Sequence, residues 1–344
     1  MIRRSRVLAA TLLAAVLVTA SACSSSDDSS SGDTKKSGAS GDLKKVTYVT
    51  AFGAVGRDSF IWVAKEKGFF KDAGIDVDIQ KGAGNVQNLT LIKSGQAQFA
   101  ALDFTGAEIQ AGLGKFTNWR AVAAIHQQTL VSIMTTKDTG ITKPSDLVGK
   151  KVATGKGSVS ELLFPAYAKL AGFDAKGVTM QGVPSTSLNQ LMAKRTVDAL
   201  STFLLSKKAL ETASKKEVTV LPYSEYLSDL FGNAIIAREE TIASDKDLVK
   251  KFTDAAMKGL QYTVDHPDEA ATIMNKAETS AAIPAAIGEI NAMKPYVSSP
   301  NGAPLGHIDQ ERVARSIAVL AANGLMPSGL TPDKIVDFSF IPAS

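Results

Sequence analysis

The sequence is poor in the residues that most often carry reactive chemistry. Its 344 residues include one cysteine, Cys23, and three histidines, His126, His266 and His307. The histidines lack the spacing of metal ligands, and no pair of cysteines exists to complete a metal site. The G-x-S-x-G and H-E-x-x-H patterns of hydrolases are also missing. We therefore expect no catalytic residue, no metal and no cofactor, and a protein that is not an enzyme.

Long apolar runs and clusters of one charge are scarce as well. After residue 23, no apolar segment approaches the roughly 20 residues that a bilayer-spanning helix needs. The formal net charge is +4, with 38 basic and 34 acidic residues, and the first six residues hold three of the arginines. Without these three the basic count falls to 35, so the excess is +1. Because nucleic-acid binding needs Lys and Arg clustered on one face, we expect no nucleic-acid partner and no integral membrane domain.

The first 22 residues have the pattern of a secretory signal. Basic residues precede a short apolar run, Val7 to Val18, and small residues then lead to Cys23. The run is too short to span a bilayer, so we expect this segment to direct export and then to be removed. Residues 20–23 resemble the bacterial lipobox, with Ala20 where Leu is usual, and predict lipidation of Cys23. An ordinary signal peptide followed by an unmodified cysteine is the alternative.

Residues 23–42 are predicted to form a tether behind the lipid. From Ser24 to Asp42 the chain consists mainly of Ser, Asp, Gly, Lys and Thr, with nothing to anchor a core. A flexible coil of this length reaches roughly 25 Å, enough to hold a folded body clear of lipid headgroups. We therefore expect a lipid-anchored protein at the extracytoplasmic face of the cell membrane.

The remaining residues alternate between strand and helix patterns. Residues 46–50, 75–79 and 99–102 have the pattern of strands, and helical spacing separates them. After a polar stretch containing Pro144 and Gly149, a second series begins with a strand at 151–154. Such alternation predicts the α/β class, with mostly parallel sheets and helices on both faces, in two lobes. The pattern leaves the position of the late helices, up to residue 323, open.

Ligands of open α/β sheets bind beyond the carboxyl ends of the strands. This rule selects the loops 52–58, 82–85, 103–106, 155–160, 184–187 and 202–206, which two facing lobes would bring into one cleft. The candidate ligand contacts lie in or beside these loops; they are Phe52, Asp58, Trp62, Asn85, Asp103, Phe104, Thr105, Gly157, Ser158, Ser160, Ser185 and Phe203.

Each type of candidate also has a plain structural interpretation. The aromatic residues can stack on a flat ligand or simply pack in the core. Asp58 favours an amine-bearing or cationic solute if it faces the ligand, but it can instead cap the helix that begins before Phe60. The loop from Gly155 to Ser160 follows a strand and opens a helix, so it can hold an anion or merely begin the helix with Ser158 as its cap.

Four segments resemble a known family, the solute-binding proteins for nitrate, sulfonates, taurine and the pyrimidine precursor of thiamine. They are residues 60–77, 91–99, 146–153 and 194–199, and the resemblance runs from about residue 46 to about residue 275. It implies a type II periplasmic binding protein with two α/β lobes joined by two crossover strands. Lobe one would comprise residues 43–135 and 232–344, and lobe two residues 136–231. The implied partners are a small solute and the permease, with its ATPase, of an ABC importer, which a monomeric receptor serves by closing its lobes.

Functions of other classes stay open. Fungal relatives with the same body are pyrimidine synthases that use a histidine near the start of the first helix and a cysteine-rich motif. Asp58 stands at the histidine position here, and the sequence has no cysteine cluster. A sensor lipoprotein without a transporter is a further alternative. For the ligand, Asp58 and the cleft aromatics favour a neutral or amine-bearing heterocycle such as an aminopyrimidine, whereas Arg57 and the 155–160 loop suit nitrate, a sulfonate or taurine.

Overall fold

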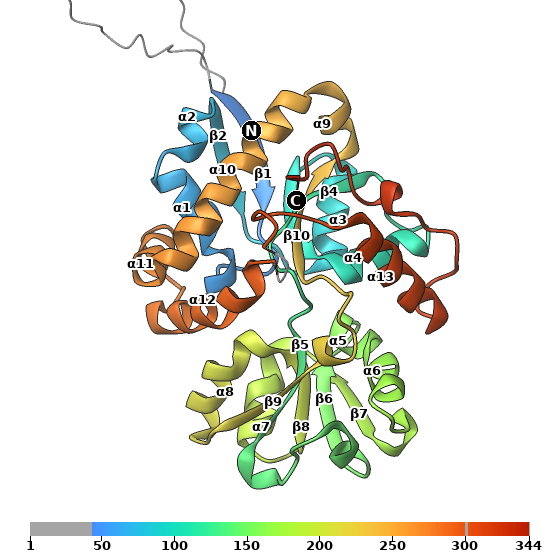
Figure 1. The fold of residues 1–344 in the computed structure, drawn as a ribbon. Helices are drawn as coiled ribbons and strands as arrows, with labels where there is room; N and C mark the ends of the chain where they lie inside the picture. Colours follow the sequence, from blue (N-terminus) through green and yellow to red (C-terminus); the bar gives the residue numbers. More distant parts are fainter. Residues whose placement is uncertain (1–42, 300–301, 344) are drawn as a thin grey trace, which may run out of the picture. The chain divides into compact units, whose positions relative to one another are not determined.

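Two five-stranded sheets with flanking helices make up the part of the chain that the computed structural model describes, residues 43–299 and 302–343 (Figure 1). The signal-like segment, Cys23 and the tether lie outside these residues, so the export, lipidation and tethering inferred from the sequence stay predictions. Within the described ranges, no helix is both long and apolar enough to cross a membrane.

The first sheet has the strand order β2-β1-β3-β10-β4. β1 pairs in parallel with β2 and β3, as the βαβ rhythm predicts, whereas β10 comes from late in the chain and pairs antiparallel with β3 and β4. β3 has neighbours on both sides and all its residues are buried, which suits its apolar sequence. The strands are β1 (Lys44–Val49), β2 (Ile75–Gln80), β3 (Phe99–Asp103), β4 (Trp119–Ala124) and β10 (Asn233–Arg238).

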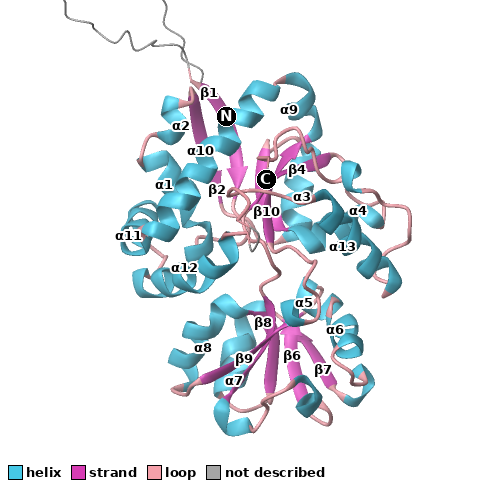
Figure 2. Ribbon diagram, in the orientation of Figure 1, coloured by secondary structure: helices cyan, strands magenta, loops and turns pink. Residues whose placement is uncertain are grey.

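Helices from both ends of the chain cover the first sheet (Figure 2). The ring of Phe252 on α10 stacks on Phe99 of β3 with centroids 3.8 Å apart, and on Phe70 at 5.0 Å. Ser316 on α13 donates a hydrogen bond of 2.7 Å to the Glu108 carboxyl group on α4. The late helices, which the sequence pattern leaves unplaced, therefore complete this lobe. The helices are α1 (Ser59–Glu66), α2 (Phe69–Asp72), α3 (Asn85–Ser94), α4 (Phe104–Gly112), α9 (Glu239–Ser244), α10 (Lys246–Asp265), α11 (Pro267–Ala277), α12 (Ile283–Val297) and α13 (Gln310–Ala322).

The second sheet has the order β7-β6-β8-β5-β9. β6 pairs in parallel with β7 and β8, and β5 pairs antiparallel with β8 and β9. Its strands are β5 (Val131–Thr136), β6 (Lys151–Gly155), β7 (Thr179–Val183), β8 (Ala199–Phe203) and β9 (Val218–Pro222). Its helices are α5 (Val159–Leu162), α6 (Phe164–Leu170), α7 (Leu188–Ala193) and α8 (Lys207–Ser214).

β5 lies in a different sheet from the one that the predicted boundary implies. The family resemblance implies that residues up to 135 belong to the first lobe, but β5 forms its ladder with β8 and β9 of the second sheet. All six of its residues are buried, as expected for a strand with a neighbour on each side. The chain therefore leaves the first sheet after Ala124.

Short single-turn helices shape many of the connections. These are η1 (Gly56–Asp58), η2 (Lys137–Thr139), η3 (Pro144–Leu147), η4 (Ala175–Gly177), η5 (Ser185–Ser187), η6 (Leu204–Ser206), η7 (Tyr223–Glu225) and η8 (Pro332–Lys334). η1 and η6 follow β1 and β8, at the carboxyl ends where the sequence analysis expects ligand contacts.

Two segments, residues 125–130 and 223–232, link the two sheets. Arg312 on α13 bonds to both: its guanidinium donates to the backbone carbonyl of Gln127 in the first, and to those of Asp229 (3.2 Å) and Leu230 (3.3 Å) in the second. The same guanidinium lies 4.0 Å from the centre of the Phe231 ring. This is the predicted fold of two α/β lobes joined by two crossover connections.

Candidate functional site

The carboxyl ends of strands from both sheets lie beside the connecting segments. β4 ends at Ala124, just before the first connection, and the next strand begins with Val131 paired to Phe203, the last residue of β8. Residues of the two lobes also meet here, since Leu204 and Leu205 of η6 share a core cluster with Ile290 of α12. The loop after β8, one of those selected from the sequence, therefore lies beside the connections and contacts α12 of the first lobe.

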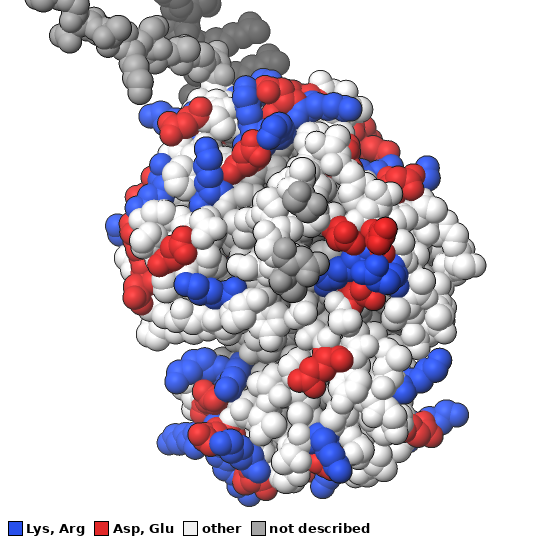
Figure 3. Space-filling model, viewed as in Figure 1, with Lys and Arg blue, Asp and Glu red and all other residues white. Residues whose placement is uncertain are grey.

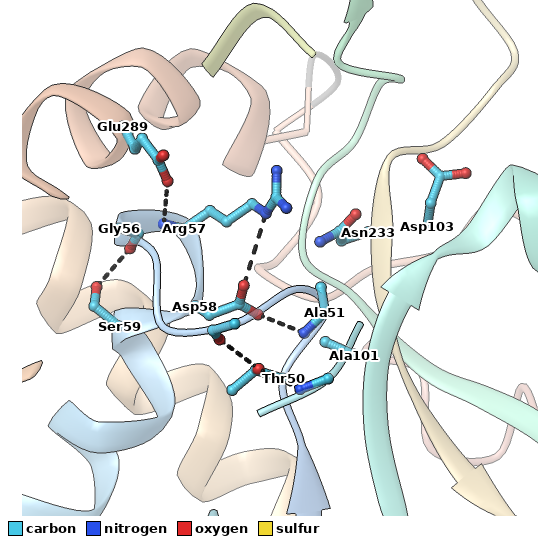
Figure 4. Close-up of polar contacts among 12 residues, drawn as sticks. Thr50, Ala51, Gly56, Arg57, Asp58, Ser59, Ala101, Asp103, Asn233 and Glu289 are labelled. Carbon is cyan, nitrogen blue, oxygen red and sulfur yellow. Dashed lines mark hydrogen bonds and ion pairs between the residues drawn. The ribbon is translucent and has the colours of Figure 1, made fainter. Parts of the chain in front are cut away.

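The loop after β1 is fixed by its own polar groups (Figure 4). The Asp58 carboxyl group accepts a hydrogen bond of 2.9 Å from the Ala51 backbone N–H, and the Thr50 hydroxyl donates to the Gly53 carbonyl at 2.6 Å. Asn88 on α3 donates at 2.9 Å to the carbonyls of Thr50 and Ala101, which ties the loop to β3. Asp58 thus closes the loop, and its side chain makes no capping bond at the start of α1.

Arg57 is the cation at the centre of a group of buried carboxyl groups. Its Nε lies 3.7 Å from Oδ2 of Asp58, and its backbone N–H donates to the Glu289 carboxyl group of α12 at 3.5 Å. Its charge also acts on Asp103 and His126. η1 rests directly on α12, because a Cβ at Gly56 would lie 2.3 Å from the Ala286 carbonyl oxygen.

Burial decides the charge states in this group. Burial raises the pKa of Asp58 to about 6 and that of Asp103 to about 7, although the positive charge of Arg57 opposes both shifts. Burial likewise raises the pKa of Glu289. Burial and the Arg57 charge lower the pKa of His126 to about 3, so the imidazole is neutral at physiological pH. The positive charge of Arg57 therefore acts on three carboxyl groups, of which Asp58 lies within ion-pair distance of the guanidinium.

Asp103 ends β3 and caps α4. Its Oδ1 accepts a hydrogen bond of 2.8 Å from the Gly106 N–H, and the Asn85 side chain bonds to both the backbone carbonyl (2.7 Å) and the backbone N–H (3.0 Å) of Asp103. The second carboxyl oxygen, Oδ2, is buried and has no hydrogen-bond partner among the described residues. Asn233, the first residue of β10, pairs directly across the ladder from Asp103.

The serine-rich loop after β6 satisfies its own polar groups. The Gly157 N–H donates to the Glu161 carboxylate, and the Ser158 N–H donates to the Gly155 carbonyl at 3.0 Å. Ser158 caps α5, and the buried Ser160 hydroxyl lies 3.0 Å from that of Thr154. The Glu161 carboxylate thus binds the Gly157 N–H, in the loop that the sequence predicts as a possible anion site. Ser185 is exposed nearby, with its Oγ 2.4 Å from where a Cβ on Gly155 would lie.

The aromatic candidates separate into two kinds. Trp62 and Phe104 are buried in the core, with Phe104 packed edge-on against the rings of Trp119 and Phe231. Phe52 is 42% exposed, and Phe203 is half-buried with its ring 5.6 Å from the guanidinium carbon of Arg57. Thr105 is also buried and donates to the Phe231 carbonyl at 3.0 Å. Phe52 and Phe203 are therefore the aromatic candidates that remain near a surface.

Several residues of this region were not among the sequence candidates. Arg57 had a signal, because it adjoins Asp58 in a predicted cleft loop, but its central position depends on helix α12 arriving from 230 residues later. Glu289 and Asn233 had no signal in the sequence, since Glu289 lies on a late helix and Asn233 on a strand that returns to the first sheet. His126 is one of three scattered histidines in the sequence, and nothing in its local pattern indicates that it is buried.

Comparison with known proteins identifies the family. The family described as NMT1/THI5 like matches residues 58–270. The chain belongs to the NMT1/THI5-like family. This NMT1/THI5-like chain is 24% identical over 270 residues to the formylaminopyrimidine-binding protein of Halalkalibacterium halodurans, which covers 77% of the chain and 81% of that relative. It is 25% identical over 215 residues to the riboflavin-binding protein RibY of Chloroflexus aurantiacus, covering 61% and 59%.

The fold of this NMT1/THI5-like protein is that of periplasmic binding proteins. The aliphatic sulphonate binding protein SsuA of Escherichia coli superimposes with a TM-score of 0.70 at 14% identity, over 88% of this chain and 93% of that one. At this identity the likeness concerns the fold alone. The two-lobed type II architecture expected from the sequence is thereby confirmed.

Proposed function

We propose that this chain is an extracytoplasmic solute-binding lipoprotein of an ABC importer, which captures a neutral or amine-bearing heterocycle between its lobes and delivers it to a permease. The observation that carries the ligand class is that the one positive charge of Arg57 acts on three carboxyl groups, those of Asp58, Asp103 and Glu289. Binding proteins with this fold close on their ligand by rotating two lobes about a hinge.

The charge balance of this group favours a neutral or amine-bearing ligand over an anion. An anion buried here would meet one positive charge, which Asp58 already partly neutralises, and the partial negative charge that Asp103 keeps near its pKa of about 7. In the 155–160 loop, the other proposed anion site, the N–H groups of Gly157 and Ser158 are engaged by the Glu161 carboxylate and the Gly155 carbonyl. A ligand with N–H donors would instead find acceptors in the buried carboxyl groups.

The relatives support the same ligand class. One is named for binding formylaminopyrimidine and the other for binding riboflavin, and both compounds are planar nitrogen heterocycles. Phe52 and Phe203, which remain near a surface, offer ring faces on which such a ligand can stack.

Ligand-dependent thermal stability tests the proposal. The chain without its first 22 residues, carrying Cys23→Ser, is heated with pyrimidines, thiamine, riboflavin, sulfonates, taurine or nitrate. A ligand at 100 times its Kd adds about 2.7 kcal/mol to the free energy of unfolding, which raises the melting temperature measurably. We expect a response to an amine-bearing or neutral heterocycle. A response confined to nitrate, taurine or the sulfonates would refute the proposed ligand class.

Fractionation of the producing cell tests the lipid anchor. We expect the full-length chain to remain with membranes after a high-salt wash and to incorporate labelled fatty acid. Cys23→Ser should remove the label and release the protein, since two acyl signals are needed for stable anchoring and this change removes the acceptor. Unchanged labelling of the variant would show that Cys23 is not the lipidated residue. Loss of uptake of the bound solute when the gene is deleted would separate an importer receptor from a sensor.

A further inference from the structure

The end of β3 carries a buried carboxyl oxygen that the fold itself does not use. Asp103 is 7% exposed, and its Oδ1 and backbone groups are all engaged, by Gly106 and by Asn85. Its Oδ2 has no partner among the described residues. A buried acceptor without a partner destabilises the protein, so a ligand that supplies a donor here gains affinity that a water-exposed site would not provide.

The residues around Asp103 limit which chemical group of a ligand can donate to Oδ2. Asn233 stands directly opposite in the antiparallel ladder, and side chains of such a pair lie on the same face about 5 Å apart. Its amide has both donors and an acceptor. Arg57 acts on Asp103 by its charge from η1, on another side of the region (Figure 4). The pair of Asp103 and Asn233 therefore presents acceptor and donor groups from neighbouring strands, and the charge of Arg57 acts on the carboxyl group.

We propose that Asp103 Oδ2 and the Asn233 side chain form the subsite that recognises the edge of an aminopyrimidine-like ring, where an exocyclic amino group adjoins a ring nitrogen. This inference rests on the proposed function and specifies its ligand edge. One amino N–H donates to Asp103 Oδ2 and the other to the side-chain oxygen of Asn233. Oδ2 is the carboxyl oxygen that takes part, because Oδ1 is already held by the Gly106 N–H.

Three small pyrimidines serve as probes. 4-Amino-2,5-dimethylpyrimidine presents the amino group beside the ring nitrogen, 2,5-dimethylpyrimidine lacks the amino group, and 2,5-dimethylpyrimidin-4-one reverses donor and acceptor. With the Cys23→Ser protein, calorimetric titration should give the amino probe about 10- to 100-fold tighter binding than the probe that lacks the amino group, because the latter leaves the carboxyl oxygen unpaired.

Asp103→Asn is the informative substitution. Asparagine caps a helix as well as aspartate does, so the bond to the Gly106 N–H is kept, while Oδ2 becomes an NH2 donor. We expect the variant to bind the amino probe at least 10-fold more weakly and to prefer the 4-oxo probe. A purely structural role would weaken all probes alike and leave their order unchanged. Asp174→Asn makes the same change at an exposed capping residue of the second lobe, where the Asp174 side chain accepts from the Lys176 N–H at 2.9 Å, and should leave the order of probes as it is.

The outcomes separate the subsite from the proposed function. Equal binding of the amino and deamino probes, or an unchanged order in Asp103→Asn, would overturn the subsite while leaving a heterocycle receptor in place. Failure of every pyrimidine and flavin to bind would overturn the heterocycle proposal and the subsite together. If Asp103→Asn does not fold, Asn233→Ala provides the same comparison, with an expected loss of at least 5-fold for the amino probe and a smaller loss for the deamino probe. Equal losses for the two probes would refute the role of this pair.

Discussion

At the scale of single residues, burial determines what an ionisable side chain does here. Asp58 looks from the sequence like a ligand contact or a helix cap, yet its carboxyl group bonds to the Ala51 N–H and lies near Arg57. Asp103 carries the same functional group, and one of its oxygens has no hydrogen-bond partner within residues 43–299 and 302–343. Glu108, one turn into α4, is fully buried and accepts a hydrogen bond from Ser316 of α13. The same functional group thus closes a loop at Asp58 and joins two helices at Glu108, and Asp103 is the residue for which we propose ligand recognition.

Glu108 should make stability depend on pH. Burial raises its pKa to about 8, the Asp103 charge adds to this, and the Ser316 hydrogen bond and Arg312 oppose it. The unfolded chain ionises this group near pH 4.3, so between about pH 4.5 and 8 the native state binds more protons. The free energy of unfolding contributed by Glu108 therefore falls as pH rises through this window. Glu108→Gln keeps an acceptor for Ser316 and cannot ionise, so the variant should gain stability relative to the parent from pH 5 to pH 8.

Urea unfolding at several pH values measures this difference. We expect the advantage of Glu108→Gln to grow by up to about 1 kcal/mol per pH unit and to level off above pH 8. Glu66→Gln, at an exposed position of α1, serves as a control and should change stability by no more than about 0.5 kcal/mol at each pH. A difference for Glu108→Gln that stays constant with pH would contradict the raised pKa.

At the scale of elements, helices that are distant in sequence complete the core of the first lobe. α10 begins with Asp245 as its cap, which accepts from the Leu248 N–H at 3.0 Å, and buries a face that includes Phe252. The ring of Phe252 meets Tyr48 of β1, Phe70 of α2 and Phe99 of β3. One side chain therefore joins the late helix to three early elements.

Phe252→Ala should be strongly destabilising. The change removes a fully buried ring and leaves a cavity among three aromatic neighbours, for which we expect a loss of about 3 to 5 kcal/mol in the free energy of unfolding. Leu170→Ala, at a position of α6 that is 46% exposed, is the matched control and should cost less than about 1 kcal/mol. Equal losses for the two variants in chemical denaturation would mean that α10 is not part of this core.

At the scale of the whole molecule, both connections between the sheets meet one side chain. Arg312 donates to backbone carbonyls of residues 127, 228, 229 and 230 and lies over the Phe231 ring. Its neighbour on α13, Arg315, makes an exposed ion pair of 3.0 Å with Asp229. On the face drawn in Figure 3, other charged side chains of both signs are intermixed. Arg312 thus differs from the surface charges in bonding to the backbone segments that connect the two sheets.

Arg312→Lys should loosen the connections while keeping the charge. An ammonium group is a single point donor and cannot reproduce the planar fork that reaches both segments, so we expect a loss of about 2 kcal/mol in stability and weaker ligand binding. Arg315→Lys is the control on the same helix and should cost less than about 1 kcal/mol. Distances between spin labels placed on α8 and α11 would report a broader distribution for Arg312→Lys alone. An unchanged distribution would contradict the role of Arg312 at the connections.

The sequence by itself determined the α/β class, the order of strands and helices in each series, the loops at the strand ends and the family. These follow from local periodicity and from short motifs such as residues 60–77, so they need no knowledge of distant contacts. The localisation, an exported chain with lipid on Cys23, is also inferred from a local sequence pattern and stays a prediction.

Only the tertiary structure decided which candidate site residues lie close together and which of their ionisable groups have shifted pKa values. The sheet of β5, the return of β10 beside β3 and the arrival of α12 over Arg57 all depend on contacts between residues far apart in sequence. Trp62 and Phe104 could not be separated from Phe52 and Phe203 without burial, because an aromatic ring suits a core and a ligand equally well. The oxygen Oδ2 of Asp103, which has no partner among the described residues, also depends on tertiary contacts. Asn85 and Gly106 bond to the other polar groups of Asp103, and the packing of α3 and α4 at the end of β3 positions them.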